Sequence, residues 1–157
     1  MQSDLAFDEA VALSPPVQKP VLKAPWHLYL IGAAALLWSA VGVFDFLATL
    51  TRFPPYMDRF PEAAREYWAT LPAWVFGVWA LGVFSALIGA VMLLRRQRRS
   101  VRVLAGSTAS TLLATALSYS RPAADYDANR VFAVCIIVVS LLILNYAYHQ
   151  SKHGVLR

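Results

Sequence analysis

Two long apolar runs flank a short basic segment, and this arrangement limits what the chain can fold into. The run 73–94 contains no ionisable residue, and the run 101–118 contains a single arginine. Apolar runs of about 18 residues or more with few charges are typical of transmembrane helices. Basic residues in a short loop between two spans are typical of the cytoplasmic side. The pattern therefore predicts an integral membrane protein with this loop in the cytoplasm. The basic residues are Arg95, Arg96, Arg98, Arg99 and Arg102.

Two further runs, 26–50 and 131–148, have the same apolar character. At ~1.5 Å per helical residue the four runs cover ~27–37 Å each, which is enough to cross a hydrocarbon core of ~30 Å. The composition agrees, because 59% of the 157 residues are hydrophobic and only 15% are charged. We therefore expect an all-α, integral membrane four-helix bundle, in which 101–118 is the most polar span.

The net charge of +5 does not indicate a nucleic-acid partner, because membrane topology explains the basic residues. The outer loops carry five arginines and five acids, whereas the basic residues of the inner side have no such balance. Both termini are therefore predicted to be cytoplasmic, with the lipid bilayer as the main partner. The inner basic residues are Lys19, Lys23, the five arginines above, Lys152 and Arg157.

The segments outside the runs are short. Residues 1–25 are expected to form a cytoplasmic tail, in which four prolines predict a stiff, extended spacer, and residues 149–157 a second cytoplasmic tail. In the first outer loop, 51–72, Pro61 suits the first turn of a short amphipathic helix. Such a helix, rich in aromatic residues, usually lies in the membrane interface. A lid over an outward-facing cavity is the alternative interpretation.

Asp45 is the only ionisable residue well inside a predicted span, in its outer half. A carboxylate there costs several kcal/mol unless it is hydrated, paired or protonated, so it should face the bundle or a cavity. Arg52, one or two turns further on, could reach back towards it. In the structural interpretation Asp45 makes a helix-packing hydrogen bond, or an ion pair with Arg52 or Arg121. In the functional interpretation it couples protons or binds a cation. Its expected neighbours at the same depth are Trp79 or Gly77, Thr115, Ser118 and Cys135.

Helices two and three carry small residues at four-residue spacings, which let helices approach closely and bond across the contact. We expect the two helices to pack as a hairpin, and their surfaces to be where the chain contacts itself or other membrane proteins. A polar conduit along helix three is the alternative. The small residues are Gly82, Ala86 and Ala90 in helix two and Gly106, Ser107, Ser110, Thr111 and Thr115 in helix three.

Few residues offer catalytic chemistry. Cys135 is the single cysteine, which excludes an intramolecular disulfide or a dithiol redox pair. His149 and His153 share a helical spacing, but they lie where the last helix ends, and a metal or haem site needs converging ligands. Phosphate-binding loops, nucleophile elbows and zinc-helix motifs are missing from the sequence. We therefore expect no metal, no cofactor and no enzymatic activity.

Several short motifs lie between residues 26 and 98: Phe44-Asp45-Phe46, Tyr56-Met57, Pro61-Glu62 and Pro72-Ala73-Trp74, before a glycine-containing span that ends in arginines. In these motifs the chain resembles a family of small proteobacterial four-helix inner-membrane proteins. Automated labels in that family sometimes read sugar transporter, and its members have no assigned catalytic residues to carry over. The resemblance implies a four-span fold, a multi-pass location in the bacterial inner membrane, and importance of Asp45.

Two functions remain open at this stage. The first is a structural or accessory membrane protein that binds lipids or other membrane proteins. The alternative is a small proton- or cation-coupled transporter, of sugars or other small solutes, that uses Asp45. The position of Asp45 discriminates them: a cavity bounded by helix three favours transport, whereas a carboxyl closed off against Arg52 or Thr115 favours packing.

Overall fold

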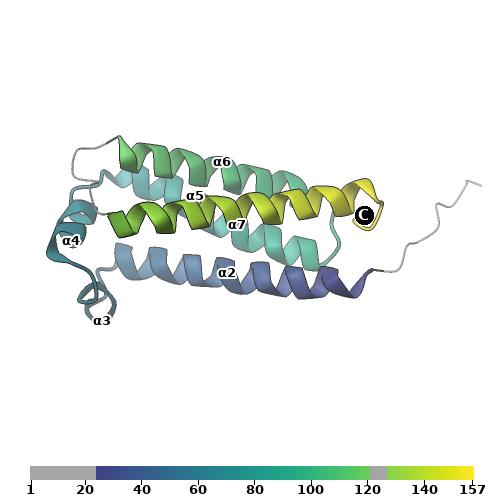
Figure 1. Cartoon of the computed structure of the whole chain (residues 1–157), viewed down its shortest axis with the longest axis horizontal. Helices are drawn as coiled ribbons and strands as arrows, with labels where there is room; N and C mark the ends of the chain where they lie inside the picture. The colour runs from purple at the N-terminus through teal and green to yellow at the C-terminus, as the bar shows by residue number, and fades with distance from the viewer. Residues whose placement is uncertain (1–23, 121–126) are drawn as a thin grey trace, which may run out of the picture.

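The computed structural model describes residues 24–120 and 127–157, and all regular structure within these residues is helical. Four long helices lie alongside one another, with two short helices at one end (Figure 1). The expected all-α class is thereby confirmed. The helices are α2 (Trp26–Leu50), α3 (Pro54–Met57), α4 (Glu62–Ala69), α5 (Ala73–Leu94), α6 (Ser100–Tyr119) and α7 (Asp127–Lys152).

The loop between α2 and α5 holds two short helices, so the described residues form six helices and not a simple bundle of four. The helix expected after Pro61 is α4. The additional helix, α3, forms because Pro54 and Pro55 fix the backbone of its first turn, which closes through a 3.0 Å bond from the Asp58 N–H to the Pro54 carbonyl. This additional helix was not predicted from the sequence.

Three of the helices are long and apolar enough to cross a membrane: α2, α5 and the part of α7 from Arg130 to Lys152. The predicted third span is a helix of 20 residues, α6, but it is not one of these three. Its serine and threonine side chains lower its apolar character. Ser107 and Ser110 nevertheless bond within the protein, to carbonyls of α5, at 2.8 and 2.7 Å.

The long helices point many of their large apolar side chains outwards and many of their small residues inwards. Leu37, Leu81 and Leu142 are 69%, 64% and 61% exposed. Gly32 and Ala35 in α2, by contrast, are buried. A soluble protein of this size rarely exposes so much contiguous apolar surface. This distribution is the one expected of helices that face lipid.

α5 and α6 form the most extensive helix pair, which confirms the predicted hairpin. Glycines allow the close approach. A Cβ at Gly89 would lie 2.7 Å from Cδ2 of Leu104, and a Cβ at Gly82 would lie 3.3 Å from Oγ1 of Thr111. The hydroxyl bonds of Ser107 and Ser110 to α5 cross this same contact. Small residues and interhelical hydroxyl bonds are the usual means of helix association in membranes.

At the end that carries the arginine turn, the bundle is closed by a core of six buried residues. The residues after α7 turn back over this core, and they are tied to the arginine turn by backbone bonds between Arg157 and both Arg96 and Arg98, at 2.7 and 2.5 Å. At this same end of the bundle, His27 Nδ1 and the Tyr146 hydroxyl lie 2.6 Å apart, and this contact joins α2 to α7. The core consists of Leu28, Leu93, Leu104, Ala147, Val155 and Leu156.

Candidate binding cavity

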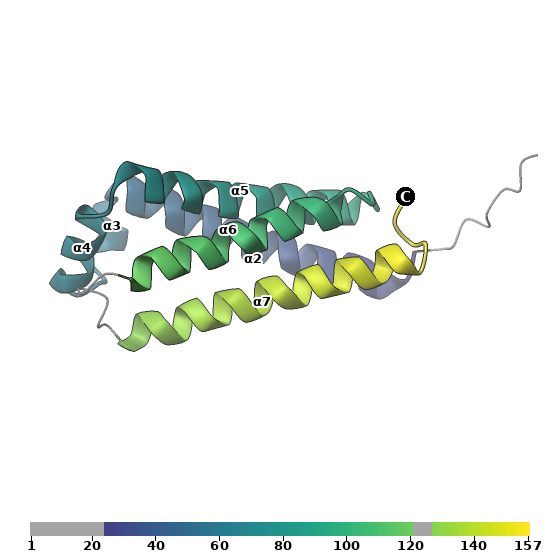
Figure 2. The same cartoon turned by 90° about the horizontal axis from the view of Figure 1, so that it is seen from above.

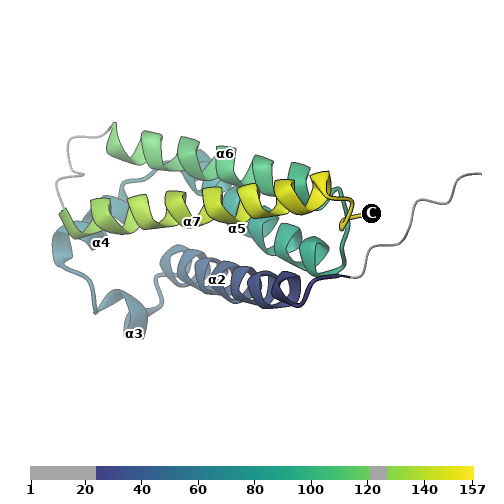
Figure 3. The ribbon, with the colours of Figure 1, turned by 45° about the vertical axis from the view of Figure 1, so that its right-hand side comes forward.

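A cavity of about 470 Å³ lies between the four long helices. It extends from the short helix α4 towards the buried core at the arginine turn, as far as Ala90 and Leu104. α4 lies across the end of the bundle that is opposite the C-terminus (Figures 1 and 2). Figure 3 shows α6 and α7 side by side above α2. α2 and α7 make little direct contact within the described residues, and this leaves the space open.

Small side chains on all four helices explain why the space is not filled. Gly42 lines the cavity from α2, and Gly82 and Ala86 line it from α5. Ala114 lines it from α6 and Ala133 from α7. Because close-packed interiors normally leave few voids larger than a water molecule, a space of this size between helices is a candidate binding site.

Asp45 lines this cavity from α2, and its Oδ1 accepts a 2.5 Å hydrogen bond from the hydroxyl of Tyr56. Tyr56 belongs to α3, which returns the chain over the end of α2, so that the rings of Phe44 and Tyr56 meet edge to face at 5.6 Å. Among the described residues, Tyr56 is the only side chain that bonds to Asp45. The carboxyl is thus held from one side and faces the cavity on the other.

The protonation state of Tyr56 fixes the direction of this bond. Burial raises the pKa of the Tyr56 phenol, and its hydrogen bond to Asp45 and the charge of that carboxylate raise it further, while Arg59 opposes the shift. The phenol therefore keeps its proton at neutral pH and donates to the carboxyl. Tyr56 was singled out from the sequence only within the Tyr56-Met57 motif, and this role was not predicted. The Pro-Pro step before it, which turns the chain back, was the available signal.

Aromatic rings surround the end of the cavity near α3 and α4. The Phe60 ring contacts those of Tyr56 and Trp68 at 5.2 and 4.9 Å between centroids. Trp79, from α5, packs on Phe46 at 5.3 Å. The Tyr67 hydroxyl donates to the Ser118 carbonyl at 2.9 Å and so fastens α4 to α6. Among the described residues that line the cavity, Asp45 is the only charged one.

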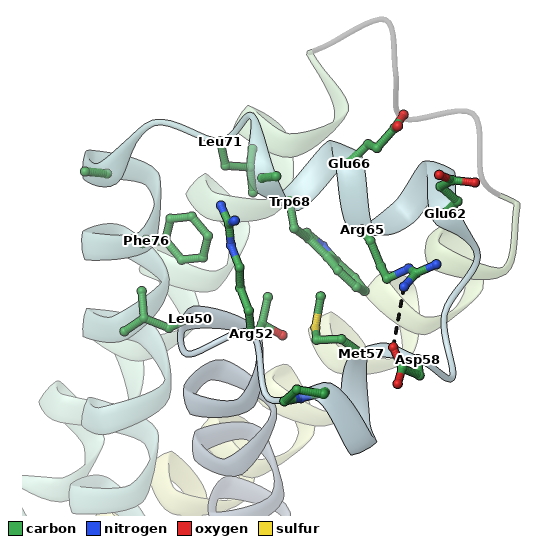
Figure 4. A pocket seen from close by; sticks show the side chains of 14 residues that line it. Leu50, Arg52, Met57, Asp58, Glu62, Arg65, Glu66, Trp68, Leu71 and Phe76 are labelled. Carbon is green, nitrogen blue, oxygen red and sulfur yellow. Dashed lines mark hydrogen bonds and ion pairs between the residues drawn. The ribbon is translucent and has the colours of Figure 1, made fainter.

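The structure brings four of the five residues singled out from the sequence to this one cavity: Asp45, Trp79, Thr115 and Ser118. Arg52 is the exception and lines a separate pocket of about 750 Å³ between the end of α2, α4 and α5. Figure 4 shows its side chain extended between Phe76 and Trp68, away from the Arg65–Asp58 ion pair, which measures 3.5 Å.

The turn at the end of α2 explains where Arg52 points. The backbone φ of Arg52, 52°, is in the left-handed region. The Phe53 N–H bonds to the Ala48 carbonyl at 2.9 Å, as in a helix ended by a left-handed residue. No ion pair joins Arg52 to Asp45 in the structure. Arg121, the other basic residue considered for Asp45, lies outside the described residues. Cys135 and Gly77 are both exposed and do not line the cavity.

The histidines lie at the opposite end of the bundle from Asp45. His149 and His153 stack at 5.5 Å, and His27 is engaged with Tyr146. No group of three histidine, cysteine or acidic side chains in residues 24–120 and 127–157 is arranged to hold a metal ion.

Comparisons of the chain with protein families, with curated proteins and with solved structures give no match. The resemblance inferred from the motifs between residues 26 and 98 therefore stays a prediction. What the site can do must be argued from its own geometry.

Proposed function

We propose that the chain is a multi-pass protein of the bacterial inner membrane, with both termini in the cytoplasm, that carries a small solute and uses Asp45 as its coupling carboxyl. The exposed leucines and the three apolar helices support insertion in a membrane. α6 would be the fourth span, because its hydroxyls bond inside the bundle and its 20 residues cover ~30 Å. The arginine turn would mark the cytoplasmic end, so that Asp45 would lie in the outer half and the cavity would reach from there towards the cytoplasmic end.

One observation carries the proposal: Asp45 faces a cavity bounded by α6 and pairs with no arginine of residues 24–120 and 127–157. An ionisable residue inside a membrane is costly, and it is kept where it serves an ion or substrate pathway. A purely structural carboxyl would have its hydrogen-bonding capacity filled by neighbouring helices. Within the described part of the chain a single phenol bonds to it, which leaves the carboxyl able to exchange a proton for a solute.

The two ends of the cavity differ in a way that suits alternating access. The cytoplasmic end is closed by the buried core that includes Leu28 and Leu93. The outer end is covered by α4, whose bond to α6 through Tyr67 is a single hydrogen bond. Transporters expose a central site to one side at a time. Release of α4 would open the site outwards, and separation of the leucine core would open it inwards.

A structural or accessory role is the second candidate, and the outer face of α6 favours it. Ala105, Gly106 and Ala109 are exposed there, and a Cβ at Gly106 would meet no atom within 4 Å. An exposed row of small residues suits close contact with a helix of another membrane protein. In that role the cavity would have no ligand.

A flux measurement decides between these functions. The purified chain is reconstituted in vesicles that contain a pH-sensitive dye, and gradients of glucose, glycerol, alanine or tetraphenylphosphonium are imposed. We expect at least one gradient to drive a change of internal pH that Asp45→Asn abolishes and Asp45→Glu retains. Asp58→Asn is the matched control, because that carboxylate is exposed and lies outside the cavity. Transport is excluded if folded wild-type protein behaves as empty vesicles with all four solutes.

A further inference from the structure

We infer that the cavity binds an organic monocation with an apolar body, such as a substituted ammonium or phosphonium ion. The inference rests on the proposed function for its site, but it concerns what the site recognises. Its first basis is charge. Asp45 is the only charged residue among the described residues that line the cavity, so the empty site with an ionised carboxyl has a net charge of −1. A ligand with one positive charge neutralises it, whereas an anion or a zwitterion leaves a charge uncompensated in a low-dielectric space.

The second basis is a set of three tryptophans that line the same cavity as that carboxyl. Trp38 and Asp45 lie two turns apart on the same face of α2, and both line the cavity. Trp79 faces them from α5, while Trp68 covers the outer end. Cations are attracted to the faces of aromatic rings, most strongly to tryptophan, and the attraction grows when the site excludes water. Three tryptophans and one carboxylate form a site suited to a cation with apolar substituents.

The third basis is that six of the ten hydroxyl side chains in the described lining already donate to the protein, which argues against a sugar. Ser39 and Thr108 donate to carbonyls of their own helices at 2.8 and 2.9 Å, and Ser140 does so at 2.8 Å. Ser107 and Tyr67 donate to neighbouring helices. A polyol would leave many of its own hydroxyls without partners, and each unpaired group costs about 1–3 kcal/mol. An organic cation with apolar substituents has few groups that need a hydrogen-bond partner.

The volume agrees with this class of ligand. Cavities for small molecules usually measure ~300–1,000 Å³, are mainly apolar, and orient the ligand with a few polar groups. At about 470 Å³, the space fits that range. The Tyr119 hydroxyl also belongs to the lining and has no hydrogen-bond partner among the described residues.

Binding of tetraphenylphosphonium to the full chain in detergent tests the inference, by equilibrium dialysis and by quenching of tryptophan fluorescence. We expect saturable binding that Asp45→Asn weakens about tenfold or more and Trp79→Phe weakens about threefold. Asp58→Asn and Trp74→Phe are the matched controls, because both side chains are exposed and outside the cavity. The neutral analogue triphenylphosphine oxide should bind at least about tenfold more weakly than the cation, because it lacks the charge that pairs with Asp45. Acid should weaken binding of the cation, since a proton competes for the same carboxyl.

Three results would overturn the inference: no saturable binding to the wild type, equal binding of the neutral analogue, or unchanged binding to Asp45→Asn. The neutral analogue is tested on the wild type, so the inference remains testable if Asp45→Asn does not fold. Failure of the inference is distinguishable from failure of the proposed function. Proton flux driven by glucose without cation binding would overturn the ligand class alone. Saturable cation binding without flux of any solute would overturn transport and leave the ligand class standing.

Discussion

The Tyr56 hydroxyl donates a 2.5 Å hydrogen bond to Oδ1 of Asp45, and it thereby joins the α3 turn to the end of α2. Eleven residues separate the two in sequence. The bond positions the carboxyl without neutralising it, because a phenol carries no charge at neutral pH. Replacement of Tyr56 by a basic residue would produce an internal ion pair and remove the free charge from the cavity. The choice of a phenol as partner is therefore what leaves Asp45 available to a ligand or a proton.

Tyr56→Phe should lower the stability of the protein by ~1–3 kcal/mol, the usual range for loss of a hydrogen bond to a charged group. The ring contacts with Phe44 and Phe60 would remain, since only the hydroxyl is removed. Unfolding in detergent, followed by circular dichroism, measures the change. Tyr29→Phe is the control, because Tyr29 is half-exposed and does not line the cavity. Equal stability of the two variants would show that the bond contributes nothing measurable.

The same bond predicts a dependence on alkaline pH. The pKa of Tyr56 is raised by burial and by Asp45, so the unfolded chain loses the phenolic proton at a lower pH than the folded one. Folding stability from this group is complete below about pH 10, the ordinary value for tyrosine, and it decreases as pH rises above that value. Melting temperatures between pH 8 and 11 should show a steeper decline for the wild type than for Tyr56→Phe. Parallel curves would contradict the prediction.

Gly89→Ala should destabilise the α5–α6 hairpin. The added Cβ would lie 2.7 Å from Cδ2 and 2.8 Å from Cγ of Leu104, which is itself buried. Overpacking costs ~1–3 kcal/mol, and it outweighs the gain of up to ~1 kcal/mol that alanine brings to a helix. Gly77→Ala is the control, since nothing lies within 4 Å of its Cβ, and it should be neutral or stabilising. A Gly89→Ala protein as stable as Gly77→Ala would mean that the two helices can separate at no cost.

The spans and the hairpin could be predicted from the sequence because they depend on local properties. Length and apolar character were enough to predict α2 and α5, whose observed bounds are those expected. The spacing of small residues was enough to predict the contact between α5 and α6. The partner of Asp45 could not be found in this way. Arg52 would lie on the same helical face as Asp45 only if α2 continued to residue 52. The helix ends before it, and the left-handed turn at Arg52 directs its side chain into a separate pocket.

The cavity could not be predicted from the sequence either. Asp45, Trp79 and Thr115 could be predicted to lie at the same depth in the membrane, because the depth of each follows from the rise per residue along its own helix. Whether the space between them is filled depends on how far α7 lies from α2, and this is a tertiary property with no local signal. The core at the arginine turn could not be predicted for the same reason, since it requires residues 153–157 to turn back onto α2, α5 and α6.

Leu156→Ala should therefore destabilise the protein, although Leu156 lies near the end of the chain. The residue is 4% exposed and packs in the core with Leu28 and Leu93. Leu→Ala changes in a closed core cost ~2–5 kcal/mol. Leu142→Ala, which removes a side chain that is exposed to the surroundings, is the matched control and should have little effect. Thermal unfolding in detergent provides the comparison, and equal stabilities would show that the final residues are not part of the core.

The proposed orientation is tested by labelling with a maleimide that does not cross membranes. Cys135 is the single cysteine, so Cys135→Ser gives a background without thiols. Glu66→Cys, in exposed α4, should react in cells whose outer membrane alone is permeabilised. Gln97→Cys, in the exposed arginine turn, should react only after the inner membrane is also disrupted, since basic loops remain cytoplasmic. The reverse pattern would mean that the protein has the opposite orientation, with Asp45 in the cytoplasmic half, whereas labelling of both sites in the first condition would contradict the α5 span.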